Sequence, residues 1–256
     1  MKKLVMLAVA MTAIVLFSGC VQMHMESTVA DDGSGVASMT VSFSEGVAEA
    51  LAEMKELGMD EDSGQEIPSF DDINKEDLEK AAKGHGVKVK TFTKGAVDGR
   101  ETLDIVLEFD DLKSLSYVMS TMSDEDTGEG FGIFAVDGGN FILKQTTYDF
   151  PAREKEVTDE AAATEDTAPT PPAEMDPEQM QRQMAVMGKL MGAMAELDVS
   201  LKITVPGDVV SSNAPTVEGR TSIWTVNASN MMSQSQDMTP EIVFAGAGLK
   251  IKPIKE

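Results

Sequence analysis

The single cysteine of the chain, Cys20, is the residue whose position most clearly predicts chemistry. It follows a basic start, an apolar run and the sequence Phe17-Ser18-Gly19. Small residues before a cysteine at the end of such a segment are typical of a lipoprotein signal. The apolar run is too short to span a bilayer, which needs about 20 residues. We therefore expect residues 1–19 to be removed as a signal peptide and Cys20 to carry a diacylglyceryl group on its sulfur.

This modification predicts where the mature chain resides. Acyl chains on Cys20 would anchor it in a membrane and leave the remainder on the extracytoplasmic face, in the cell membrane or the outer membrane. Val21, rather than an aspartate, follows the cysteine, which favours the outer membrane in a cell that has one. An uncleaved anchor helix with a chance cysteine is the alternative. A lipid-modified Cys20 leaves no thiol for a disulfide within one chain.

Methionine is the other residue type with chemical potential, because its thioether is a soft ligand for Cu(I). The sequence Met23-His24-Met25 is one candidate, but in a strand the two methionines point to one side and the histidine to the other. Core packing is therefore expected there. With two histidines and one cysteine in the chain, a Cys/His zinc site is excluded. We expect no metal site.

A second group of methionines recurs at spacings of four and three residues, which places its members on one face of a helix. The members are Met180, Met184, Met187, Met191 and Met194. Such a stripe is expected when an amphipathic helix packs on a sheet. Methionine is also flexible and polarisable, so the same face could line a site for acyl chains. Both interpretations stay open, and the stripe is the tentative ligand-binding site.

Catalytic groups are sparse. His85, between two glycines, could act as a general base, but a surface-loop histidine is the expected role. The acidic runs 71–72 and 124–126 are unremarkable in a chain with 44 acidic residues, and Gly128 stands where an EF-hand needs an oxygen ligand. Neither a Walker A sequence nor G-x-S-x-G occurs. We expect no enzyme, no catalytic residue and no cofactor.

Charge limits the partners. The chain holds 44 acidic and 21 basic residues, a formal net charge of -23. Nucleic-acid binding depends on basic side chains that displace counterions from phosphates, so no nucleic acid is expected as a partner. The same charge should hold the domain away from an anionic membrane surface.

The elements that would position these residues alternate between hairpins and helices. Two runs of alternating apolar residues around an Asp-Gly turn form a β-hairpin, and this pattern occurs three times. Apolar residues at three- and four-residue spacing predict the helices. The predicted hairpins are 21–29/36–43, 87–92/102–109 and 131–136/140–147; the helices are 47–58, 75–83 with Asn74 as N-cap, 110–122 and one that begins at Pro177; later strands are 197–205, 209–210, 220–226 and 242–252. This order predicts an α+β fold, an antiparallel sheet built from hairpins with amphipathic helices packed on one face.

One segment departs from globular composition. Residues 152–178 are rich in acidic residues, proline and alanine and contain no aromatic side chain. Such a segment buries too little apolar surface to order itself, so we expect a disordered insert. Residues 20–151 and 179–256 would then be two parts of the same envelope domain.

Two stretches resemble the LppM-like bacterial lipoproteins. The first runs from Gly19 and Cys20 to Gly35. The second contains a strand, a turn and further strands after Leu201, in which the residues of the family motif are Pro206, Gly207, Asn213, Glu218, Gly219 and Trp224. The resemblance implies an extracytoplasmic α/β domain associated with envelope lipid or glycolipid. Relatives often carry a C-terminal transmembrane helix, whereas the last apolar stretch here, 242–251, is too short and interrupted by glycines.

The expected function is that of a lipid-anchored cell-envelope protein whose non-catalytic domain binds an apolar or amphiphilic ligand, a lipid or glycolipid, between sheet and helices. The alternative is a ligand-free envelope scaffold that contacts another protein through its acidic surface and insert.

Overall fold

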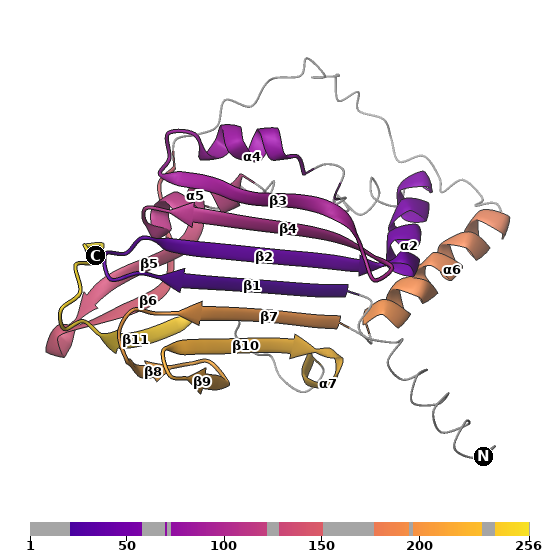
Figure 1. The fold of residues 1–256 in the computed structure, drawn as a ribbon. Helices are drawn as coiled ribbons and strands as arrows, with labels where there is room; N and C mark the ends of the chain where they lie inside the picture. The colour runs from indigo at the N-terminus through magenta and orange to yellow at the C-terminus, as the bar shows by residue number, and fades with distance from the viewer. Residues whose placement is uncertain are drawn as a thin grey trace, which may run out of the picture.

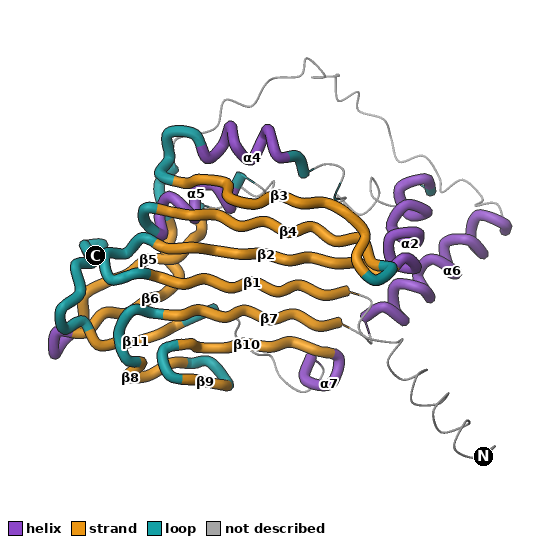
Figure 2. The backbone as a smooth tube through the Cα atoms, in the orientation of Figure 1, coloured by secondary structure: helices purple, strands orange, loops and turns teal. Residues whose placement is uncertain are grey.

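The computed structural model describes residues 21–57, 70, 73–121, 128–150, 177–194, 197–231 and 239–255. These residues form two β-sheets and five helices, an α+β fold dominated by antiparallel pairs, as the sequence predicts. Cys20 and the expected signal segment lie outside the described residues, as does most of the expected insert. Figures 1 and 2 show the arrangement.

The larger sheet, sheet A, contains seven strands in the order β3-β4-β2-β1-β7-β10-β9. Their bounds are β1 Val21–Val29, β2 Gly35–Ser44, β3 Val87–Val97, β4 Arg100–Phe109, β7 Leu197–Thr204, β9 Thr216–Glu218 and β10 Thr221–Asn227. The hairpins β1-β2 and β3-β4 are those predicted from alternation. A bulge in β3 inserts one residue between Val89 and Thr91, so Val89 and Phe92 both pair with apolar positions of β4 although they are three positions apart in sequence.

The smaller sheet, sheet B, contains four antiparallel strands in the order β5-β6-β11-β8. Their bounds are β5 Glu129–Val136, β6 Asn140–Thr147, β8 Val209–Ser212 and β11 Glu241–Ala245. The 3-10 turn Asp137–Gly139 joins β5 to β6, and Gly138 adopts φ 78° there. The predicted final strand is shorter than expected because the chain turns at Gly248, where φ is 81°.

The helices are α2 Glu45–Glu56, α4 Lys75–Ala82, α5 Leu112–Ser120, α6 Pro177–Met194 and the short α7 Ala228–Met231. Asn74 caps α4, since its side-chain oxygen accepts a hydrogen bond from Asp77 N at 2.8 Å. Asp111 caps α5 in the same way through Ser114 N at 2.8 Å. The helices predicted over 47–58, 75–83 and 110–122 are thus confirmed to within a few residues.

Sheet A differs from the prediction in one pairing. β1 and β7 run parallel, with Val21 opposite Leu197 and Thr28 opposite Thr204. The sheet is therefore mixed rather than antiparallel, because the chain returns to the middle of the sheet through a long connection. No local turn sets this register. It depends on the apolar side chains that both strands direct to the same face.

One face of sheet A, here called the inner face, carries the core. Its central row crosses five strands through residues paired in register: Ile105, Met39, Met25, Leu201 and Trp224. Sheet B and α5 lie behind the same end of sheet A in Figure 1 and cover this face there. The predicted packing of helices on one face is thus made by α5 together with a second sheet.

The two sheets meet closely at Gly207, between β7 and β8. The residue is buried, and a Cβ placed on it would clash with the carbonyl oxygen of Ala245 at the end of β11. Only glycine allows this approach, which also lets Ala245 N donate to Asp208 O at 2.9 Å.

We expect Gly207→Ala to lower the free energy of unfolding by about 2 kcal/mol or more, because overpacking against a backbone carbonyl forces the sheets apart. Gly188→Ala is the matched control, since Gly188 is exposed on α6 with open space around its Cβ position. The control should be neutral or stabilising by about 0.5–1 kcal/mol. Urea unfolding of both variants measures the difference, and equal midpoints would contradict the close-approach explanation.

Candidate functional site

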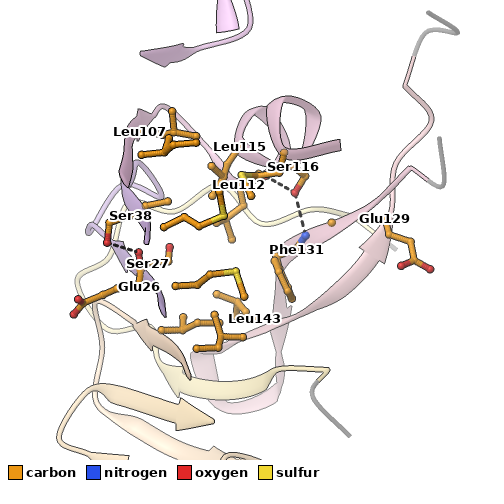
Figure 3. A pocket seen from close by; sticks show the side chains of 18 residues that line it. Glu26, Ser27, Ser38, Leu107, Leu112, Leu115, Ser116, Glu129, Phe131 and Leu143 are labelled. Carbon is orange, nitrogen blue, oxygen red and sulfur yellow. Dashed lines mark hydrogen bonds between the residues drawn. The ribbon is translucent and has the colours of Figure 1, made fainter. Parts of the chain in front are cut away.

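An apolar cavity of about 200 Å³ lies between the inner face of sheet A, α5 and sheet B (Figure 3). Its walls are mainly aliphatic, aromatic and thioether side chains. Representative lining residues are Met25, Met39 and Leu201 of sheet A, Leu115 and Met119 of α5, and Phe131 of β5. This cavity is where we look for ligand chemistry.

The cavity exists because small side chains occupy the middle of one row of the inner face. Ser27 and Ala37 are paired across β1 and β2, between the larger Leu107 on β4 and Ile203 on β7. All four line the cavity. Small residues between large ones leave a volume that the covering layer does not fill.

The covering layer is held at a fixed distance by Ser116 of α5. Its hydroxyl donates to Leu112 O at 2.7 Å and accepts a hydrogen bond from Phe131 N at 3.1 Å. This contact requires Gly130 in β5, because a Cβ at that position would clash with the Ser116 side chain. The pair therefore fixes α5 on β5 and sets the roof of the cavity.

The cavity contains one polar side-chain atom without a hydrogen-bond partner among the described residues, the hydroxyl oxygen of Ser27. Its neighbours on the same face, Ser222 Oγ and Trp224 Nε1, are also buried without a partner. A buried hydroxyl that makes no hydrogen bond costs about 1–3 kcal/mol. A ligand oxygen beside Ser27 would recover part of that cost.

Tyr148 follows β6 and contacts Phe131, a residue of β5 that lines the cavity. Its hydroxyl donates to Phe131 O at 2.6 Å. Burial and, as a smaller cause, the Asp111 carboxylate raise the pKa of the Tyr148 phenol from 10.0 to about 12. Folding thus favours the protonated phenol.

Because the folded pKa of Tyr148 lies above its ordinary value, its stabilising contribution is full below pH 10 and is lost as the pH rises towards 12. We expect the free energy of unfolding of the native chain to fall over this interval more steeply than that of Tyr148→Phe. Chemical unfolding of both proteins at pH 9 and at about pH 11 tests this. Parallel losses in the two proteins would exclude Tyr148 as the cause.

The methionine stripe of α6 lies elsewhere. Met184, Met187 and Met191 are 65%, 53% and 71% exposed and do not line the cavity. The side chains of Met180 and Met194 lie outside the described residues. The described part of the helix packs mainly on α2, and Val186 is buried there at 1% exposure. The expectation that the stripe packs on a sheet was wrong, because α6 uses its opposite side.

The methionines that do line the cavity are Met25, Met39 and Met119. Sequence reasoning placed Met25 and Met119 on apolar faces but did not bring them together. The available signal was a small residue two positions from each strand methionine: Ser27 after Met25 on β1, and Ala37 before Met39 on β2. Such a pattern predicts unfilled space only when the pairing of the strands is known.

The motif residues after Leu201 occupy turns and the core. Pro206 and Gly207 are buried at the junction of the sheets, and Trp224 is fully buried in β10. Glu218 is exposed, and Gly219 adopts φ 62° in the β9-β10 turn.

Asn213 links β8 to β11. Its amide donates to Thr239 O at 2.8 Å, and its oxygen accepts from Glu241 N at 2.9 Å. None of these six motif residues lines the cavity.

The two histidines do not form a site with the methionines. His24 lies on the outer face of sheet A, where its Nδ1 is 2.7 Å from Ser200 Oγ. Met23 and Met25 alternate with it to the inner face, as predicted. His85 stacks on Tyr117 with ring centroids 3.9 Å apart. Within the described residues, no group of three or more His, Cys, Asp or Glu side chains could hold a metal ion.

The fold and the cavity together define a class: an α+β domain with a mixed sheet, a second small sheet and an apolar cavity between them. In the part of the chain that the structure describes, no helix is long and apolar enough to cross a membrane.

No protein-family model matches the chain, and no curated protein matches it. Among solved structures, the chain is similar to the NMR structure of the folded domain of the LppM protein from Mycobacterium tuberculosis. The identity is 12%, the match covers 90% of this chain and 92% of that chain, and the TM-score is 0.43. The similarity is one of fold and does not place the chain in a family.

Proposed function

We propose that this chain is a lipid-anchored envelope protein whose domain, without catalysis, holds one apolar chain of a lipid or glycolipid in the cavity between sheet A, α5 and sheet B. The observation that supports this function is the cavity itself. A hollow lined by thioether and aliphatic groups takes up an alkyl chain at little cost, because methionine side chains adapt their shape to it.

The cavity volume limits what can enter. An apolar cavity of about 150 Å³ accommodates a molecule the size of benzene. About 200 Å³ therefore accommodates a single chain segment of roughly eight carbons rather than two complete acyl chains. The remainder of an amphiphile would lie outside the cavity.

Ser27 adds a chemical preference. Ser27 lines the cavity, and its hydroxyl is buried without a hydrogen-bond partner, so it would donate to a ligand oxygen that reaches it. An acyl chain with a hydroxyl or ester oxygen satisfies both features. Lipids and glycolipids of the envelope belong to this chemical class.

The only tryptophan of the chain provides a direct test. Trp224 is fully buried and is paired with Leu201, which lines the cavity. A brominated fatty acid bound there should quench Trp224 emission from residues 21–256. We expect the larger side chain of Ala37→Phe to fill the cavity. The affinity measured by quenching should then fall at least about tenfold, because the alkyl chain of the fatty acid loses most of its buried contact area.

Val36→Phe is the matched control, because Val36 is 41% exposed and alternates to the other face of β2. It should quench like the native chain. No quenching of the native chain, together with no lipid extracted from protein isolated from its own host, would refute ligand binding and favour the scaffold alternative.

The unpaired hydroxyl of Ser27 gives a second prediction: its removal should increase the stability of the domain but weaken ligand binding. Ser27→Ala should raise the free energy of unfolding by about 1 kcal/mol, because it removes a buried group without a partner. The same variant should bind the brominated fatty acid several-fold more weakly. Ser116→Ala is the control: its hydroxyl is paired, so its loss should destabilise the domain by about 1–2 kcal/mol. A destabilising Ser27→Ala would show that the hydroxyl is already satisfied.

A further inference from the structure

The register of sheet A locates the expected lipid anchor relative to the helices. Val21, which directly follows Cys20, is paired with Phe43 of β2 and with Leu197 of β7. α2 begins two residues after Phe43, and α6 ends three residues before Leu197. The chain therefore emerges from Cys20 at the same end of the sheet where α2 and α6 lie side by side (Figure 1).

Among the described residues, α6 presents an exposed apolar face at this end. Met184, Met187 and Met191 follow each other at three- and four-residue spacing and are each more than half exposed. At 100° per residue they lie on one side of the helix, opposite the buried Val186. The other large exposed apolar residues among those described are single valines on separate elements.

The methionine face of α6 is uncharged, whereas the chain as a whole is strongly acidic. The side of α6 that carries the methionines contains Gln181 and Gly188 but no charged residue, by the same helical geometry. Lys189 lies on the α2 side, where its ammonium is 3.1 Å from the Glu53 carboxylate. The methionine face itself therefore adds no charge to the repulsion expected from the net charge of -23.

We propose that the Met184, Met187 and Met191 face of α6 docks into the interfacial region of the lipid bilayer that holds the acyl chains of Cys20. The proposal rests on the lipid anchor of the proposed function. An amphipathic helix with a flexible apolar side lies in the plane of a membrane surface and buries that side at the boundary of headgroups and acyl chains.

The lipid anchor on Cys20 would compensate for the weak affinity of the helix for a bilayer. Three methionines without basic neighbours bind a bilayer weakly, but tethering through Cys20 raises the local bilayer concentration into about the millimolar range. Docking should then depend on apolar contact and not on anionic lipid. This distinguishes the helix from a polybasic membrane site, which needs negative headgroups.

Oxidation of the methionines themselves can report whether a bilayer covers them. The full chain, recovered with its lipid from bacterial membranes and reconstituted into phosphatidylcholine vesicles, is treated with dilute hydrogen peroxide. Mass spectrometry then gives the oxidation rate of each methionine. We expect Met184, Met187 and Met191 to oxidise about tenfold more slowly than in the same chain without its lipid mixed with the same vesicles. Addition of phosphatidylglycerol should not increase the protection.

A variant provides an independent readout. Met184→Gln, Met187→Gln and Met191→Gln combined should remove the slowing of amide hydrogen exchange in α6 that vesicles cause. Val210→Gln with Val217→Gln is the matched control, since both valines are exposed on other elements. The control should exchange like the native chain.

Oxidation at equal rates in the anchored and lipid-free chains would overturn the proposal. Equal and fast rates would mean that the face stays exposed, and equal and slow rates would mean that the chain itself or a second copy covers it. A chain recovered without lipid on Cys20 would also overturn the proposal. The triple glutamine variant should still show quenching of Trp224 by the brominated fatty acid, and Ala37→Phe should still show protection of α6. Failure of docking is therefore separable from failure of ligand binding.

Discussion

The inner face of sheet A must be kept from water, and the layer that covers it is shorter than the sheet. Where β1 ends and β2 begins, the face is well covered: Val29 is 3% exposed, and Phe109 at the end of β4, two strands away, is 2% exposed. At the other end, Val21 and Met23 are only half-buried. The cavity lies between these regions, where the small residues Ser27 and Ala37 leave space beneath α5 and β5.

The decrease in burial along β1 runs from the cavity to the first residue of the strand, Val21. From Met25 in the cavity wall, the inner face continues through Met23 to Val21, a distance of about 13 Å for four residues of a strand. Phe43 and Leu197 extend the same half-buried strip across the neighbouring strands. An apolar surface thus leads from the proposed ligand site to the end of the sheet where the proposed anchor and α6 lie.

Local signals predicted most elements but few of their contacts. Alternation identified the three hairpins, and the caps Asn74 and Asp111 lie where polar residues precede apolar periodicity. The division into two sheets was not predicted, because β8 and β9 are too short to show which sheet they join. The stripe on α6 marked an apolar face without indicating its partner, and the opposite side, with Val186, proved to be buried. Cavities depend on pairing between distant strands, so sequence periodicity alone does not reveal them.

The parallel pairing of β1 with β7 has a consequence for biogenesis. Val21 and Leu197 are separated by most of the chain, so β1 is synthesised long before its second neighbour exists. Until then, one edge of β1 offers unpaired N–H and C=O groups beside apolar side chains, which is a template for aggregation. Contacts between such distant residues also close slowly, because the entropy of a long loop is lost first. The nascent domain therefore depends on late completion of its sheet, because the β1-β2 hairpin lacks its β7 neighbour until that strand has been synthesised.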